Sequence, residues 1–313
     1  MAVATFDPQY RAATEAVALL DRSERGKLAL SGPQAAEFLD SLLSNDIASL
    51  QPGAGIDATL LTHKGRMLAE VRVLCTDDEL ELDTERVSLQ ALFDALHRSR
   101  VGYDVELHKR TLALGLLSLI GPASDAALAS PPGPAEHDHR STTLDGHAVR
   151  VIRTDVGIDV LCESVHTAAV SASLEQAGAL PIEEPVAEAI RIEHGRPRFG
   201  VEIDEDTMPQ EAGIHSRAVS YSKGCYVGQE TVARLYWKGR PNRHLRGLRL
   251  SAPLAPRTPL LLGDQQVALV GSVTSSPRLG PIALALVRRE AEVGALLTTA
   301  DGSVHAAVVD LPF

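Results

Sequence analysis

Aromatic residues are scarce in this 313-residue chain: phenylalanine, tryptophan and tyrosine together make up 4% of it, while all hydrophobic residues make up 44%. Aliphatic side chains must therefore build the core. A chain of this length can bury a substantial core, and we expect it to form two or three domains or subdomains.

Cysteine is also rare. The three cysteines, Cys75, Cys162 and Cys225, lie far apart in the sequence and form no Cys-x-x-Cys pair. They cannot supply the four thiolates that hold an iron–sulfur cluster. Free, reduced thiols are typical of a cytosolic protein.

The chain has no apolar run approaching twenty residues, which excludes a membrane-spanning helix of ordinary length. Its first 21 residues contain no apolar signal core, so we expect no export signal and a cytoplasmic location. The net charge of -11 excludes a surface that binds nucleic acid or an anionic membrane as a whole.

Regular elements can be assigned from periodicity and turn residues. We expect a strand over 26–32, a helix from Pro33 to Leu43, a strand over 67–74, a helix that Ser88 caps, and a helix over 165–176. From Leu248 onward, short strands alternate with glycine turns, which is typical of a small barrel. In the strand over 67–74, Glu70 and Arg72 share a face, and this spacing predicts a solvated ion pair between them.

The clearest loop lies at 130–143 and is rich in proline and histidine. It contains His137 and His139, a spacing that can indicate a metal site. A histidine-rich short tract specifies a metal site only weakly, so a mobile surface loop is the preferred interpretation, and we predict no metal site.

The most chemically dense stretch is Lys223–Glu230, with a thiol, an ammonium, a carboxylate and two glycines in eight residues. A cation next to a partly exposed thiol is the usual setting of a reactive cysteine, so Lys223 and Cys225 are candidate catalytic residues. The alternative is that Cys225 is a small buried residue in a glycine-flanked turn.

This stretch, Lys-Gly-Cys-Tyr-x-Gly-Gln-Glu, resembles the signature of the YgfZ family, folate-binding proteins similar to the T-protein (aminomethyltransferase) of the glycine cleavage system. Three further segments resemble the T-protein: Arg-x-Glu-x-Gly at 191–195, Pro-x-Glu-Ala-Gly at 209–213, and the Gly-Ser-Val-Thr-Ser and Leu-Gly-Pro-Ile-Ala-Leu-Ala runs within 271–287. The resemblance covers nearly the whole chain.

The resemblance implies an α+β fold: a folate-binding region of two intertwined subdomains over 1–240, then a small β-barrel over 241–313. It implies tetrahydrofolate or a derivative as cofactor. It also implies a role in the assembly or repair of iron–sulfur proteins, with assembly or client proteins as partners.

Glu193 is the candidate pterin ligand. It follows three apolar residues at helical spacing, which places its carboxylate on the buried stripe of a helix over 183–195. A buried carboxylate needs a partner. The structural alternatives are Arg191, Arg196 and Arg198; the functional one is the 2-amino-4-oxo edge of a pterin, which resembles a guanidinium in its N–H groups. The resemblance assigns the pterin to Glu193.

Arg234 and Tyr236 belong to a basic, aromatic stretch that extends to Arg249. Three interpretations stay open: outward arginines that balance an acidic chain, a site for an anionic ligand such as the glutamate tail of folate, and, least favoured, a surface for single-stranded RNA. We assign Arg234 and Tyr236 to cofactor binding.

One departure bears on activity. The T-protein has an Asp-Asp pair after a glycine turn, and alignment through Gly65 puts Ala69 and Glu70 in its place. Glu70 remains a candidate folate-site carboxylate, and whether the protein is an enzyme stays open. The alternatives to an iron–sulfur factor are a folate-dependent aminomethyl or one-carbon transferase and an accessory protein of RNA modification.

Overall fold

The computed structural model describes residues 3–313. Within them the chain divides into two units. Unit 1 comprises residues up to 61, 68–187 and 217–227, and unit 2 comprises 62–67, 188–216 and 228–313. Helix α5 (Glu184–Glu193) and helix α6 (His215–Ala218) run through the points where the chain passes from one unit to the other. Among residues 3–313, no helix combines the length and the apolar character that crossing a membrane requires.

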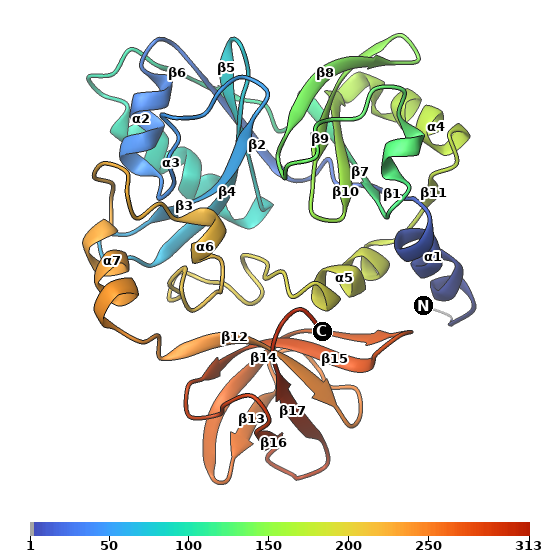
Figure 1. The fold of residues 1–313 in the computed structure, drawn as a ribbon, viewed down its shortest axis with the longest axis vertical. Coiled ribbons are helices and arrows are strands. Elements are labelled where there is room, and N and C mark those ends of the chain that lie inside the picture. The colour runs from blue at the N-terminus through green and yellow to red at the C-terminus, as the bar shows by residue number, and fades with distance from the viewer. Residues whose placement is uncertain (1–2) are drawn as a thin grey trace. The chain divides into compact units, whose positions relative to one another are not determined.

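The first sheet of unit 1 has five strands in the order β3-β4-β5-β2-β6 (Figure 1). The elements of this half are β2 (Gly26–Ser31), α2 (Ala35–Leu42), β3 (Gly55–Leu61), β4 (Met67–Cys75), β5 (Glu79–Thr84), α3 (Leu89–Ser99) and β6 (Glu106–Lys109). Its core joins α2 and α3 to the sheet, with Phe38 and Leu92 buried against Val71 and Val73. As the alternation predicted, Met67, Ala69, Val71 and Val73 of β4 are all fully buried.

The second sheet of unit 1 has six strands in the order β11-β1-β7-β10-β9-β8. Its elements, with the helices that accompany it, are α1 (Val3–Glu15), β1 (Ala18–Asp21), β7 (Leu114–Ile120), β8 (His139–Leu144), β9 (His147–Arg153), β10 (Gly157–Glu163), α4 (Thr167–Gln176) and β11 (Leu180–Pro181). Strand β1 lies in this sheet while β2, which follows it, lies in the five-stranded sheet. This crossing confirms the expected intertwining of two α+β subdomains.

Unit 2 contains α7 (Gln229–Lys238) and a closed barrel in the order β12-β15-β14-β13-β16-β17 (Figure 1). The barrel strands are β12 (Arg243–Leu250), β13 (Pro259–Leu262), β14 (Gln265–Ser276), β15 (Gly280–Arg288), β16 (Leu296–Thr298) and β17 (His305–Val309). Small and β-branched residues fill its interior, among them Ala283, Ala285 and Val308. The six strands confirm the predicted C-terminal barrel.

Two local predictions are wrong. Ser88 stands at the start of α3, but its hydroxyl bonds Thr84 and the Glu85 carbonyl instead of capping a helix N–H. His137 and His139 do not lie on a mobile surface: both are buried, and β8 begins at His139. One reason is that His137 Nε2 contacts Asp57 Oδ1, far away in the sequence, at 3.3 Å.

Candidate functional site

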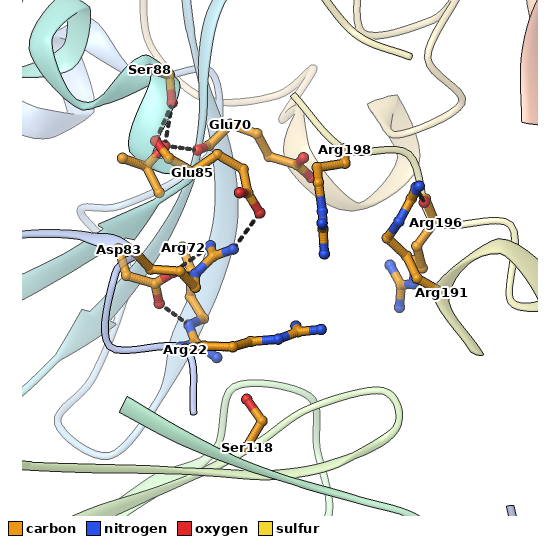
Figure 2. Close-up of polar contacts among 12 residues, drawn as sticks. Arg22, Glu70, Arg72, Asp83, Glu85, Ser88, Ser118, Arg191, Arg196 and Arg198 are labelled. Carbon is orange, nitrogen blue, oxygen red and sulfur yellow. Dashed lines mark hydrogen bonds and ion pairs between the residues drawn. The ribbon is translucent and has the colours of Figure 1, made fainter. Parts of the chain in front are cut away.

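Arg72 does not pair with Glu70. It is buried and binds Asp83 on β5 at 2.5 Å (Figure 2). It also binds Asp159 on β10 at 2.7 Å, so it ties the two sheets of unit 1 together. Burial alone would lower the pKa of Arg72, but the two carboxylates outweigh it and the net shift is upward. The predicted solvated pair is therefore replaced by a buried structural network, because the outer face of β4 is covered by the second sheet.

Glu70 instead binds Arg217 of α6. The distance from Arg217 Nη2 to Glu70 Oε1 is 2.6 Å, and Arg217 Nη1 lies 3.0 Å from Asp57 Oδ2. On its other oxygen Asp57 accepts the Nε2–H of His137 at 3.3 Å. Glu70, Arg217, Asp57 and His137 thus form one continuous polar chain in unit 1, which we call the Glu70 chain.

The side chain of Asn45 fixes the backbone of two members of the Glu70 chain. Asn45 Nδ2 donates to the carbonyls of Asp57, at 2.7 Å, and Arg217, at 2.8 Å. The side chains of Asp57 and His137 are only 10% and 11% exposed. Their placement is therefore fixed by the fold, whereas Glu70 and Arg217 keep 18% and 26% of their side chains exposed. The accessible end of the chain is the carboxylate–guanidinium pair.

The two carboxylates of this chain titrate differently. Burial raises the pKa of Glu70 more than the charge of Arg217 lowers it, so the net shift is upward. Burial would also raise the pKa of Asp57, but the hydrogen bond from His137 and the charge of Arg217 outweigh it and lower the pKa to about 2. Paired groups whose pKa values are pushed apart are typical of acid–base sites, and Glu70 is the member suited to exchange a proton.

The alternation of side chains along β4 also explains why position 69 carries no carboxylate. Ala69 points into the apolar core under α2 and α3 and is fully buried, while Glu70 points to the opposite, polar side. A second carboxylate at 69 would be buried among aliphatic side chains, at a cost of several kcal/mol. The carboxylate that faces the polar side is therefore kept, one methylene longer than an aspartate.

Lys223 is an anchor. Its side chain is 2% exposed, and its ammonium binds Asp40 Oδ1 at 2.9 Å and the carbonyls of Leu43 at 3.1 Å and Asn45 at 2.8 Å, together with that of Asp40. These carbonyls lie at and just after the C-terminus of α2, where a cation is favourable. The ammonium that was predicted to activate Cys225 is thus also bound to α2, and its catalytic role stays a prediction.

Cys225 is exposed, next to this anchor, on a loop that carries Gly224. The alternative interpretation, in which Cys225 packs as a small buried residue, is wrong. Tyr226 turns inward instead: it is buried, and burial raises the pKa of its hydroxyl to about 12. The loop therefore presents a thiol to solvent between two fixed side chains, Lys223 and Tyr226.

Glu193, in unit 2, lies where the helix phase predicted, at the end of the buried stripe of α5. Its carboxylate is 3% exposed. Two of its partners come from the barrel, far away in the sequence. Ser276 donates to its Oε1 at 2.5 Å and Arg278 to its Oε2 at 3.0 Å, both from the β14–β15 turn of the barrel.

The three arginines near Glu193 in sequence are drawn in Figure 2. Arg191 binds Glu188 and the fully buried Glu202, and Arg198 binds Glu188 at 3.3 Å. Arg191 therefore stabilises α5 and the segment that follows it. Sequence spacing could not predict these ion-pair partners, because Glu202 approaches α5 only through the turn at 198–203.

Arg234 and Tyr236 both lie on α7, but they point to different sides. Residues two apart on a helix are rotated by about 200°. Arg234 lines a cavity of about 400 Å³ together with Met208, Thr231 and Lys238. Tyr236 is 45% exposed and packs edge-on against Trp237, with ring centroids 4.8 Å apart. The structure thus does not bring these two predicted ligands onto one face.

Sequence reasoning missed several members of this arrangement: Asp57, Arg217, His137, Ser276 and Arg278. One available signal was the burial implied for Asp57 by its apolar strand. The pairings themselves were invisible, since Glu70 and Arg217 are 147 residues apart and Glu193 and Arg278 are 85 apart.

This combination of two intertwined α+β subdomains and a closed six-stranded barrel defines the class. The fold is that of a glycine cleavage system aminomethyltransferase: the T-protein structure from Bartonella henselae matches with a TM-score of 0.88, at 22% identity, over 98% of this chain and 89% of that one.

The sequence comparisons agree. The family model described as the GCVT N-terminal domain matches residues 3–223. The chain is 30% identical over 302 residues to an aminomethyltransferase of Mycobacterium tuberculosis, covering 91% of this chain and 81% of the relative. It is 27% identical over 317 residues to that of Rubrobacter xylanophilus, covering 97% and 85%. The chain belongs to the GCVT family.

Proposed function

We propose that this protein binds tetrahydrofolate through Glu193 and transfers a one-carbon group in the manner of an aminomethyltransferase. Membership of the GCVT family and the aminomethyltransferase relatives support this activity. The observation that carries the binding role is the state of Glu193: a carboxylate 3% exposed, closed off by an arginine whose own side chain is 57% exposed.

The donor set at Glu193 fits a pterin. Because 57% of its side chain is exposed, Arg278 can move into solvent and leave Glu193 Oε2 to an incoming pair of N–H groups, which replaces the charge-assisted contact that it gives up. Such a pair resembles the guanidinium it replaces. Ser276 keeps its hydrogen bond to Oε1 throughout and fixes the carboxylate plane.

When bound, tetrahydrofolate supplies the amine nitrogens that accept a one-carbon group. The chain's own contribution is proton handling and placement. Glu70, with its raised pKa, is the group that we assign to proton exchange, and Arg217 holds its carboxylate in one orientation through the 2.6 Å contact. Arg234 and Tyr236 stay proposed ligands of more distant parts of the cofactor.

A second candidate, a folate-dependent factor for iron–sulfur proteins of the YgfZ type, is favoured by one observation: Cys225 is exposed on a loop that Lys223 anchors. A thiol kept at the surface by a rigid support suits transfer to a partner protein. Iron–sulfur assembly or client proteins are the partners proposed under this reading.

The test combines binding and turnover. Calorimetric titration of tetrahydrofolate should give binding to the wild type, and Glu193→Gln should weaken it by about 10- to 150-fold, since a hydrogen bond to a charged group is worth about 1.5–3 kcal/mol. Methylene transfer from an aminomethylated carrier protein to tetrahydrofolate should then be measurable. Binding without turnover would move the iron–sulfur role to first place, and absence of binding would overturn both.

A further inference from the structure

A second cavity lies wholly within unit 2, on the side of the barrel. Its volume is about 610 Å³, which is within the range of small-molecule sites. Its walls come from the turn at 200–204, the start of β12, the loop before β13, strand β14 and the end of β15. Neither Glu193 nor any other residue assigned to folate lines it. We call it the barrel-side cavity.

Three arginines from three separate segments line the barrel-side cavity: Arg243, Arg257 and Arg288. Arg243 on β12 and Arg288 on β15 are direct cross-strand partners in the barrel. Like charges directly opposite each other destabilise a sheet. Arg243 is neutralised by Glu211 at 3.1 Å. Arg288 lies 3.6 Å from Glu290, and both of those side chains are more than 40% exposed.

Arg257 is the most informative residue. Its φ is +64°, in the left-handed region that bulky residues rarely adopt, and its N–H donates to the Val270 carbonyl at 2.7 Å. Within residues 3–313 its guanidinium has neither a hydrogen-bond nor an ion-pair partner. Left-handed residues persist where the surrounding structure holds them, often at ligand sites. Strand β14, whose Val270 carbonyl accepts the Arg257 N–H, also has an irregularity in its pairing with β15. It lies between Val270 and Val273, next to the cavity.

The acidic side chains of the cavity do not cancel this charge. Glu202 is fully buried and already accepts bonds from Arg191, from the Arg198 N–H and from the Ser272 N–H. Asp204 uses Oδ1 for the Asp206 N–H and the Thr207 hydroxyl. Among the residues that the structure describes, Arg257 is therefore left without a compensating carboxylate, and Arg288 has only its contact with the exposed Glu290, at 3.6 Å.

The rest of the wall is aliphatic. Leu269, which is 40% exposed, lies in the lining together with Pro256 and Leu286. We propose that the barrel-side cavity binds a small organic anion with an apolar body, whose phosphate or carboxylate group lies between Arg257 and Arg288. Guanidinium groups pair with both kinds of anion in the same two-pronged geometry, so charge alone does not choose between them.

The experiment uses the full chain and three probes: phenyl phosphate, phenylacetate and inorganic phosphate. Binding is followed by calorimetry at 150 mM salt and by amide chemical shifts in the barrel. We expect at least one aromatic probe to bind, at least tenfold more tightly than inorganic phosphate because of the aliphatic wall. The tighter of phenyl phosphate and phenylacetate identifies the anionic group.

Arg257→Gly is the decisive variant, because glycine adopts φ +64° without strain while the side chain that carries the guanidinium is removed. It should weaken the probe at least tenfold while the melting temperature stays level or rises. Arg288→Gln should weaken it similarly, and the matched control Arg289→Gln, next along the chain but outside the lining, should not. No binding by any probe, or equal loss in Arg289→Gln, overturns the proposal. Tetrahydrofolate affinity should be unchanged in Arg257→Gly, so this result does not depend on the folate site.

Discussion

Arg278 donates to Glu193 Oε2 at 3.0 Å, and the two members of this pair differ sharply in exposure: 57% of the arginine side chain is accessible against 3% of the carboxylate. The exposed arginine side chain covers Oε2 of the buried carboxylate in the free protein. When Arg278 moves into solvent, Oε2 can accept a hydrogen bond from a ligand. If Glu193 holds a pterin, Arg278 competes with the ligand for the same oxygen.

The first prediction is therefore that Arg278→Ala raises the affinity for tetrahydrofolate by about tenfold or more, because the ligand no longer has to displace a hydrogen bond to a charged group, which is worth about 1.5–3 kcal/mol. Calorimetry on the wild type, Arg278→Ala and the exposed control Arg289→Ala measures it. A weaker affinity in Arg278→Ala would instead make Arg278 a ligand of the cofactor, and would contradict the competition described here.

The second prediction concerns Glu70 and Arg217. Since the pKa of Glu70 is raised by burial against the pull of Arg217, the acid limb of kcat/KM for one-carbon transfer should lie above the usual glutamate range. Arg217→Met removes that pull and should move the limb to still higher pH. Glu70→Gln should lower kcat by about 10²–10⁴-fold.

The matched control for this pair is Arg110→Met, which breaks a 3.0 Å contact with Glu79 elsewhere in unit 1. It should leave the pH profile in place. A profile that does not move in Arg217→Met would remove Glu70 from proton transfer, whatever the turnover of the variant.

The third prediction is a stability effect of Asp57. Its pKa is lowered to about 2 in the folded protein, from 3.8 when unperturbed. A depressed carboxylate stabilises the fold fully above pH 4 and loses that contribution as the pH falls toward 2. At pH 7 Asp57→Asn should therefore lower the free energy of unfolding by about 2 kcal/mol.

Urea unfolding of wild type and Asp57→Asn at pH 7 and at pH 3 gives the comparison. The difference between the two proteins should shrink at pH 3, while the exposed control Asp78→Asn should show little difference at either pH. An equal loss at both pH values would mean that Asp57 acts through packing or neutral hydrogen bonds, and not through its charge.

Much of this architecture was accessible from the sequence because it follows from short-range rules. The phase of α5 put Glu193 on the buried side, and alternation along β4 separated Ala69 from Glu70. The barrel strands were evident from their glycine turns. These inferences need only the neighbours of each residue along a helix or strand.

The partners were not accessible, because they depend on how distant segments meet. Arg72 was expected to bind Glu70 but binds Asp83 and Asp159, since the second sheet covers its face of β4. His137 was placed on the surface because its carboxylate partner, Asp57, belongs to a strand that the sequence shows only as apolar. Long-range ion pairs carry no periodic signal, and the chemistry of the Glu70 chain depends on them.

The fourth prediction concerns the thiols. Cys225 should react with N-ethylmaleimide faster than Cys75 or Cys162, because it is exposed while burial raises the pKa of both other thiols and keeps them protonated. Mass spectrometry of the alkylated peptides over time measures the three rates in one sample. Cys75→Ser is the control, and should leave the rate at Cys225 unchanged. Comparable rates at Cys75 and Cys225 would contradict the prediction.

The functional role of the thiol is tested separately from its reactivity. Cys225→Ser removes one exposed sulfur atom and touches neither Glu193 nor the Lys223 anchor, so the fold and the affinity for tetrahydrofolate should stay as in the wild type. In cells that lack the protein, this variant should fail to restore the activity of iron–sulfur enzymes if the thiol serves that role, while Cys75→Ser should restore it. Full restoration by Cys225→Ser, with normal one-carbon transfer in the purified variant, would leave the transferase as the function and reduce Cys225 to a surface residue of its loop.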